Sequence, residues 1–234
     1  MWAGGSSTFG PRTARDFVKL QTFDRLRHFF AVRAPETHGK DWFGRHCLTE
    51  AANFDKLCGK TVALVGNARA LMQTSQGQSI DAHDIVIRIN NAPGLGTDAA
   101  GYKLDWLATA VLPRRLAVDR VLWIGRKVRK IPFELMTSGR LYVHEAACRN
   151  DLSEGLGARA STGIMTADLL LRSPAATITL YGFDFYTSRS LSGPHTIENT
   201  PHNYQAEKDW ITARTAQDSR LQIVPTGVDR TDAV

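Results

Sequence analysis

Short runs of apolar, often β-branched residues recur along the centre and end of the chain, each bounded by Gly, Asp or Pro. Uninterrupted apolar runs of roughly four to eight residues are typical of strands buried on both faces. The sequence predicts such strands over residues 61–65, 84–89, 121–124, 141–143, 177–181 and 221–224.

Helical segments separate several of these strands. Apolar spacing of three to four residues predicts helices over residues 162–171 and 204–216, and a further helix over about 45–57. Buried strands that alternate with helices predict an α/β fold. We expect a single Rossmann-like domain with a mostly parallel sheet flanked by helices.

The N-terminal part of the chain has a different pattern. A tail rich in Gly, Ser and Thr precedes a predicted helix over residues 13–32. In this helix, apolar residues such as Phe17, Leu20 and Phe30 recur at helical spacing, and several arginines lie between them. The favoured interpretation is a surface helix that packs its apolar stripe on the core. The alternative is a basic amphipathic helix that lies on an anionic membrane. The predicted domains are a tail and helical extension, residues 1–58, and the α/β domain, residues 59–234.

Composition narrows the class of protein. Of 234 residues, 43% are hydrophobic and 22% are charged, which excludes a wholly disordered chain and a disulfide miniprotein. A net charge of +6 favours an anionic partner without choosing among nucleotide, nucleic acid and lipid. The start of the chain has no secretory signal pattern, and Cys47, Cys58 and Cys148 form no zinc signature. We therefore expect free thiols and a cytoplasmic protein.

Polar residues follow two of the predicted strands. Gly66 and Asn67 follow the run 61–65, and Asn90 follows the run 84–89. Ligands of open α/β sheets bind at the carboxyl ends of the strands, and Asn can hydrogen-bond to a base, a ribose or a phosphate. Neither a dinucleotide fingerprint nor a P-loop is present. The structural alternative is a pair of turns.

Two further segments carry candidate chemistry. Ser161, Thr162 and Gly163 open a predicted helix, whose N-terminus suits an anion, although a simple helix cap is the commoner explanation for an isolated Ser-Thr-Gly. His195 and His202 follow the run 177–181, where a histidine can take a proton or face a phosphate. Residue 207 is five positions after residue 202, about 140° around a helix, so the spacing predicts no direct His–Glu dyad.

Together these segments resemble the family 29 glycosyltransferases, the sialyltransferase family. The large motif corresponds to Val65-Gly66-Asn67 followed by residues 80–93, from Ile80-Asp81 to Ala92-Pro93. The small motif corresponds to Ser161-Thr162-Gly163 and Tyr181-Gly182-Phe183, and the very small motif to His202 and Glu207. The resemblance covers roughly residues 60–210, with the motifs in the family's order.

The resemblance implies a GT-A-like variant of the Rossmann fold and an inverting glycosyltransferase that needs no metal and no cofactor. The donor it implies is a CMP-linked sugar acid (sialic acid, Kdo or a relative), and the acceptor is a glycan or glycolipid. His202 is then the general base, His195 lies near the leaving phosphate, and Glu207 completes the catalytic set. The nucleotide-binding residues are Gly66, Asn67, Asn90, Ser161, Thr162 and Gly163.

The chain also differs from the animal members. Their disulfide between the large and small motifs cannot form here, because residues 161–183 contain no cysteine. The chain resembles a compact bacterial member, which implies a role in surface polysaccharide such as lipopolysaccharide or capsule. We expect a cytoplasmic enzyme with an optional peripheral contact to the anionic inner membrane, and no nucleic-acid partner. The alternatives are a non-catalytic nucleotide-binding homologue and another Rossmann-like enzyme such as a methyltransferase.

Overall fold

A computed structural model describes residues 14–112, 117–188, 190–191 and 200–226. The chain forms two compact units, Met1–Arg45 and His46–Val234. No helix in these described ranges is long and apolar enough to cross a membrane.

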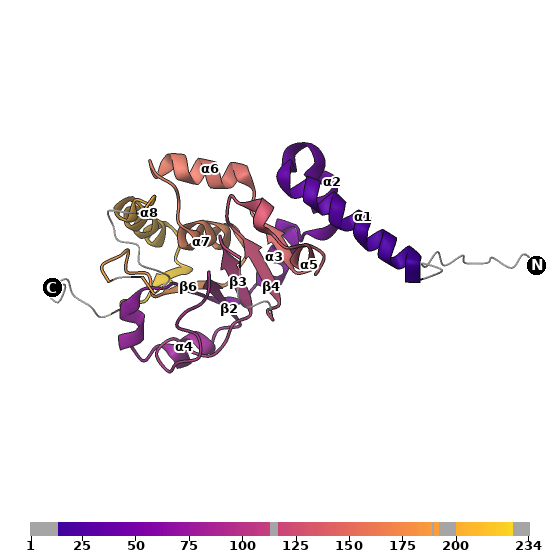
Figure 1. Cartoon of the computed structure of the whole chain (residues 1–234). Coiled ribbons are helices and arrows are strands. Elements are labelled where there is room, and N and C mark those ends of the chain that lie inside the picture. Colours follow the sequence, from indigo (N-terminus) through magenta and orange to yellow (C-terminus); the bar gives the residue numbers. More distant parts are fainter. Residues whose placement is uncertain (1–13, 113–116, 189, 192–199, 227–234) are drawn as a thin grey trace, which may run out of the picture. The chain divides into compact units, whose positions relative to one another are not determined.

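The second unit is built on one parallel sheet, which is seven-stranded in the described part of the chain (Figure 1). Its order is β5-β4-β3-β2-β1-β6-β7, and each neighbouring pair is parallel. The strands are β1 (Thr61–Val65), β2 (Ile85–Ile89), β3 (Trp106–Thr109), β4 (Arg120–Trp123), β5 (Leu141–Val143), β6 (Thr177–Tyr181) and β7 (Leu221–Ile223). The predicted α/β fold with a parallel sheet is confirmed.

Each predicted strand is present, with its ends shifted by no more than one residue. The sequence missed β3, Trp106–Thr109, although all its residues are buried at the centre of the sheet. This strand is short, and its only β-branched residue is Thr109. It begins a largely apolar run from Trp106 to Leu112 between Asp105 and Pro113, which was missed because few of its residues are β-branched.

Helices cover both faces of the sheet. Figure 1 shows α6 (Ala146–Gly155), α7 (Thr162–Arg172) and α8 (Tyr204–Gln217) on one side and α4 (Gly77–Asp81) on the other. The α7 side chains Ile164 and Leu169 pack in the larger core with Val62 and Leu64 of β1. The alternate β1 residues face a smaller core. This burial on both faces explains the continuous apolar strands.

The remaining helices of the second unit are short. They are η2 (Arg69–Gln73), η3 (Val128–Lys130), α5 (Phe133–Met136) and α3 (Glu50–Leu57). The sequence predicted one helix over 45–57, and this was wrong: α2 (Lys40–His46) ends before α3 begins. The cause is Thr49, whose side chain accepts a hydrogen bond from the N–H of Ala52 and so starts a new helix.

The N-terminal unit contains α1 (Ala14–Arg33), the π-helical turn η1 (Pro35–Gly39) and most of α2. On α1 the side chains of Phe23 and Phe30 are 56% and 51% exposed, and Leu26 is also exposed. The favoured expectation, an apolar stripe packed on the core, stays a prediction, because α1 and the core belong to different units. The division of the chain into residues 1–58 and 59–234 stays a prediction; α3 lies in the second unit.

Close packing explains two glycines of the predicted site. A Cβ on Gly66 would lie 2.4 Å from the backbone oxygen of Gly182, where the chain leaves β6. A Cβ on Gly163 would lie 2.7 Å from Cε1 of the Phe183 ring. Both glycines are thus required by contacts at the carboxyl end of the sheet.

We predict that Gly66→Ala lowers the free energy of unfolding by about 1–3 kcal/mol, because a backbone carbonyl cannot move away. Gly163→Ala costs less, since the half-buried Phe183 ring can rotate. Urea denaturation measures both. The control is Gly155→Ala in α6, where a Cβ meets no atom within 4 Å. Equal stability of the Gly66 and Gly155 variants contradicts the packing argument.

Candidate active site

A cavity of about 600 Å³ opens at the carboxyl ends of the strands. Its walls come from the segments after β1, β2, β3, β4 and β6 and from the residues that begin α7 and α8. The cavity meets the sheet where the strand order reverses, between β1 and β6, which is where open α/β sheets bind ligands.

The cavity brings together every predicted site residue that the structure describes. These are Gly66, Asn67, Asn90, Ser161, Thr162, Gly163, His202 and Glu207. His195 lies outside the described residues. Segments almost 140 residues apart in sequence therefore share one cavity, although this does not test what each residue does.

The two predicted asparagines lie at adjacent strand ends. Asn67 is buried, and its Nδ2 donates to the carbonyl of Ile89 at 3.4 Å. Asn90 has a φ of 54°, a left-handed conformation that Asn tolerates better than most residues. Its Oδ1 accepts from the N–H of Ala110 at 3.2 Å. This bond holds the amide in the cavity wall, where its Nδ2 has no partner among the described residues.

Ser161 caps α7, as the sequence predicted. Its hydroxyl accepts from the N–H of Ile164 at 3.3 Å. The carboxylate of Glu207 in turn accepts from the backbone N–H of Ser161 at 2.7 Å and from its hydroxyl at 2.8 Å. The start of α7 is thus tied to the first turn of α8.

His202 lies just before α8, which Asn203 caps. Its Nδ1 is 2.7 Å from the carbonyl oxygen of Arg159. Because a carbonyl can only accept, Nδ1 carries the proton, and Nε2 is the basic nitrogen of the neutral ring. His202 and Glu207 form no dyad with each other but contact residues 159 and 161, on either side of the same α7 entrance.

Burial controls the ionisation of Glu207. Its side chain is 2% exposed. Desolvation raises the pKa of Glu207 to about 7, against the two hydrogen bonds from Ser161, which lower it. The carboxyl group therefore titrates near neutral pH.

An aromatic wall follows β6 and was not predicted from the sequence. Phe185 and Tyr186 both line the cavity at positive φ, 53° and 65°, which is strained for aromatic residues. Tyr186 stacks on Tyr204 with ring centroids 4.2 Å apart. The carboxylate of Asp184 holds this turn by accepting from the N–H groups of Tyr186 and Ser188. The sequence signal that could have revealed this wall is the run of polar and aromatic residues directly after β6.

Asn91 was noted in the sequence only as part of a turn. It lines the cavity, and its Oδ1 is buried without a hydrogen-bond partner among the described residues. In the same described ranges, no group of three or more His, Cys, Asp or Glu residues lies together as metal ligands do. Metal independence stays a prediction. The three cysteines are free thiols, as expected.

Comparison with known proteins agrees with this geometry. The model of glycosyltransferase family 29 (sialyltransferase) matches residues 43–105. Sialyltransferase-like protein 3 of rice, Oryza sativa, is 30% identical over 132 residues, 51% of this chain and 34% of the rice protein. The type 2 lactosamine alpha-2,3-sialyltransferase of Mus musculus is 28% identical over 85 residues, 35% of this chain and 26% of the mouse protein. The chain thus spans about a third of the length of these relatives or less.

Solved structures extend the similarity to most of the fold. A mammalian sialyltransferase in complex with Gal-beta-1-3GalNAc-ortho-nitrophenol superimposes with a TM-score of 0.60 and 19% identity, over 86% of this chain and 85% of the other. A second mammalian sialyltransferase structure gives a TM-score of 0.58 at 20% identity, over 93% of this chain and 81% of the other. The fold is that of a sialyltransferase, a Rossmann-like GT-A-like variant. The resemblance to glycosyltransferase family 29 is confirmed, and the chain is sialyltransferase-like.

We predict that Glu207→Gln changes how stability depends on pH. The pKa of Glu207 is higher in the folded state than its ordinary value of 4.5. Its contribution to stability is therefore complete below about pH 4.5 and is lost as pH rises through about 7. Glutamine imitates the protonated form at every pH. The free energy of unfolding of the variant, relative to that of the wild type, should therefore rise by on the order of 2 kcal/mol from pH 5 to pH 8.

Urea unfolding at the two pH values measures this difference. Glu154→Gln, an exposed position on α6, is the control for removing one carboxylate. A stability difference between Glu207→Gln and wild type that is the same at both pH values contradicts the prediction.

Proposed function

We propose that this chain is an inverting, metal-independent glycosyltransferase that transfers a sugar acid from a CMP-linked donor to a glycan hydroxyl. The observation that carries the proposal is the single cavity in which the large, small and very small motifs meet. The similarity to family 29 supports the reaction class, and the residue chemistry below supports the roles.

The nucleotide is proposed to bind between the ends of β1 and β2 and the start of α7. Asn67 and Asn90 offer amide groups to the ribose and phosphate. The N-terminus of α7, at Ser161–Gly163, directs backbone N–H groups and a helix dipole toward an anion. These donors stabilise the leaving phosphate without a cation.

His202 is proposed to be the general base. In the reaction the acceptor oxygen forms a bond to the anomeric carbon while the bond from that carbon to the CMP phosphate breaks. The proton of the acceptor hydroxyl passes to Nε2 of His202, the basic nitrogen of the ring. The bond from Nδ1 to Arg159 fixes the ring for this transfer.

Glu207 is proposed to act through Ser161 rather than on the substrate. Both its oxygens are engaged by Ser161, and its side chain is almost fully buried. It therefore positions the start of α7 against the start of α8. His195 keeps its proposed place near the leaving phosphate.

The proposed sugar acid is sialic acid, Kdo or a relative, and the proposed acceptor is a glycan or glycolipid. The proposed setting is cytoplasmic, in a process such as bacterial surface polysaccharide synthesis. The named relatives, from rice and mouse, offer no support for Kdo or for a bacterial glycan. Donor competition distinguishes these sugar acids directly.

We predict that Asn90→Asp weakens CMP binding about ten- to a hundredfold, since a carboxylate cannot donate to phosphate and repels it. Asp is a better replacement for Asn90 than Ala, because Asp tolerates the left-handed backbone conformation of this residue and Ala adds strain. His202→Ala should keep CMP affinity but lose about 10²–10⁴-fold in transfer rate. Calorimetry without added metal and transfer from CMP-linked sugar acids measure the two effects.

The paired design separates the roles. Gly155→Ala is the control for both assays, because Gly155 lies outside the cavity. Unchanged CMP affinity in Asn90→Asp removes that residue from the nucleotide site, and near-wild-type transfer by His202→Ala removes the proposed base. A preference for S-adenosylmethionine over CMP favours the methyltransferase alternative. CMP binding with no transfer favours a non-catalytic homologue.

A peripheral contact with an anionic membrane is proposed for α1. Its exposed Phe23, Leu26 and Phe30 can enter a lipid interface while Arg27 and Arg33 face anionic headgroups. The Arg33 guanidinium lies 3.4 Å from the centroid of Phe29, so charge and aromatic surface occur together.

We predict that the chain sediments with phosphatidylglycerol vesicles but not with phosphatidylcholine vesicles. Replacing Phe23, Leu26 and Phe30 with Ser should abolish this binding, because the inserted apolar surface is lost. Tyr102→Ser, also an exposed large side chain but in the second unit, is the control. Equal sedimentation of the triple variant and the control disproves the contact.

A further inference from the structure

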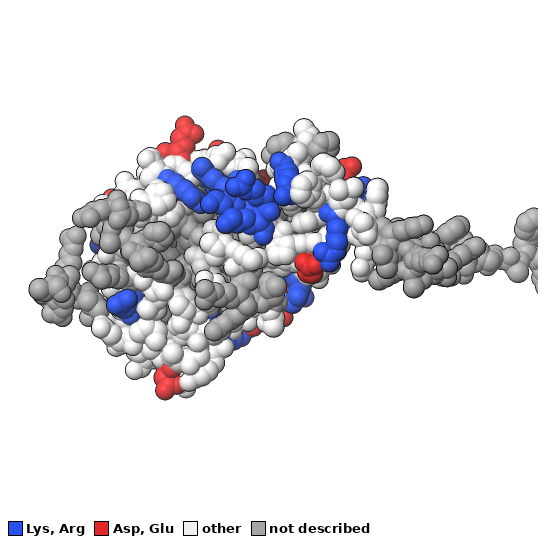
Figure 2. All heavy atoms as spheres, viewed as in Figure 1, with Lys and Arg blue, Asp and Glu red and all other residues white. Residues whose placement is uncertain are grey.

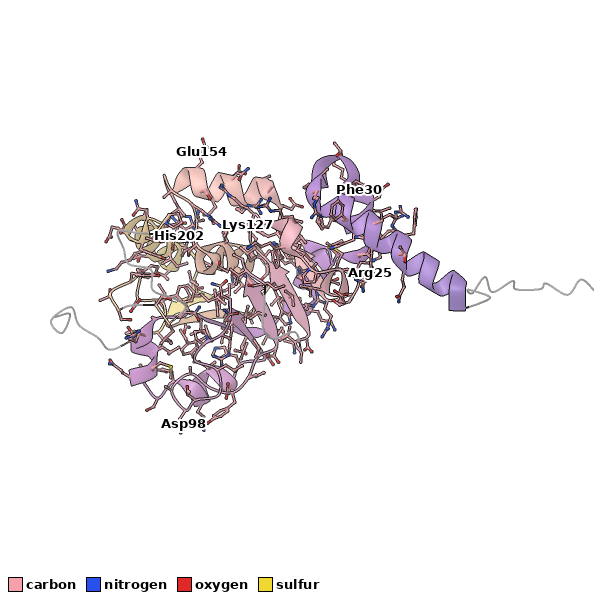
Figure 3. The ribbon with its side chains drawn as sticks, viewed as in Figure 1. Arg25, Phe30, Asp98, Lys127, Glu154 and His202 are labelled. Atoms are coloured by element: carbon pink, nitrogen blue, oxygen red, sulfur yellow. The ribbon has the colours of Figure 1, made fainter. Side chains whose placement is uncertain are left out.

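Four cationic side chains line one wall of the cavity. Arg126 and Lys127 follow β4, Lys130 ends η3, and Arg159 precedes α7. All four are exposed. Figure 2 shows Lys and Arg side chains gathered on this face below α6, and Figure 3 labels Lys127 in the same region, with His202 beyond it.

These four side chains have no internal partner. Neither a hydrogen bond nor an ion pair joins them to any described residue. Some arginines elsewhere in the second unit are paired, such as Arg172 with Glu50 at 2.6 Å and Arg220 with Asp218 at 2.7 Å. The cations of the cavity wall instead leave their charge available to a ligand.

The acidic residues of the cavity do not neutralise this wall. Glu207 is engaged by Ser161, and burial keeps it partly protonated near neutral pH. Asp184 accepts hydrogen bonds from Tyr186 and Ser188. Both carboxylates that line the cavity are thus committed to holding the backbone in place.

The surroundings reinforce the positive potential. The pKa of Arg149 on α6 is lowered, first by burial and then by the charges of Arg126 and Arg159. Three guanidinium groups therefore occupy one neighbourhood. A concave wall with charges of one sign concentrates counter-ions, here anions.

Within the cavity, Arg126 and Lys127 follow a strand that is not next to the strands of Asn67 and Asn90, whereas Arg159 lies two residues before Ser161 of the proposed nucleotide site. β4 is three strands from β1 in the sheet, about 14 Å at ~4.8 Å per strand. Arg159, in turn, supplies the carbonyl that orients His202. The cations and the proposed base therefore line one cavity, into which the acceptor must bring its hydroxyl.

We propose that the acceptor is itself anionic and carries a carboxylate or phosphate that Arg126, Lys127, Lys130 and Arg159 recognise. This inference rests on the proposed function and specifies the chemical class of the acceptor. Acidic or phosphorylated glycans can bind to these four side chains, whereas neutral glycans have no charged group for them.

The test uses three sugars that share one ring and differ only at C6: galactose, galacturonate and galactose 6-phosphate. Their binding to the CMP-saturated full chain is measured by NMR titration at low and high salt. We expect the two anionic sugars to bind about tenfold more tightly than galactose at low salt, with the difference reduced by salt. The two anionic arms distinguish carboxylate from phosphate recognition.

The triple variant Arg126→Gln, Lys127→Gln, Lys130→Gln should bind the anionic sugars about tenfold more weakly and galactose as before. Lys56→Gln, an exposed lysine on α3 outside the cavity, is the control. Retained anion binding by the triple variant, or equal affinity of the wild type for all three sugars, overturns the inference. Failure of the wild type to bind CMP overturns the proposed function instead.

Discussion

The geometry of the site depends on the buried contact between Glu207 and Ser161. A carboxylate that is 2% exposed loses most of its hydration, which is costly unless hydrogen bonds replace the water. Ser161 supplies both bonds, from its backbone N–H and its hydroxyl. The start of α7 and the first turn of α8 are thereby held together, and His202 precedes that turn. A loss of this contact frees the helix end proposed to bind the phosphate together with the proposed base.

The sheet topology places this contact where a ligand can use it. From β1 the chain moves strand by strand to β5 and then returns to lay β6 on the other side of β1. The segments that follow β1 and β6 diverge at this reversal, which leaves a crevice above the sheet. Gly66 lies so close to the carbonyl of Gly182 there that it cannot carry a Cβ without displacing the backbone, and Gly182 has a positive φ of 67°.

The sequence predicted those parts of the site that strand ends and helix caps determine. Asn67 and Asn90 directly follow apolar strands, and Ser161 precedes a helix, so local pattern places each of them at one sheet edge. The role of Glu207 could not be predicted in this way, because its partner is 46 residues away in sequence. The strained backbone of Phe185 and Tyr186 likewise depends on Asp184 and on stacking with Tyr204. β3 gave a weaker local signal, because Thr109 is its only β-branched residue, and pairing with β2 and β4 defines its bounds.

The distribution of charge could likewise be predicted only in part, because the sequence gives the net charge but not which cations the fold brings together. A net charge of +6 spread over 234 residues is modest and favours no particular anion. Folding pairs several arginines with carboxylates, which removes them from the available charge. The same folding brings Arg159, 33 residues after Arg126 in sequence, to the wall of one cavity with Lys127 and Lys130. Four unpaired cations thus gather beside the proposed base, and composition alone cannot show this. Since like charges held together cost stability unless a ligand neutralises them, the wall is better explained by an anionic substrate than by the fold.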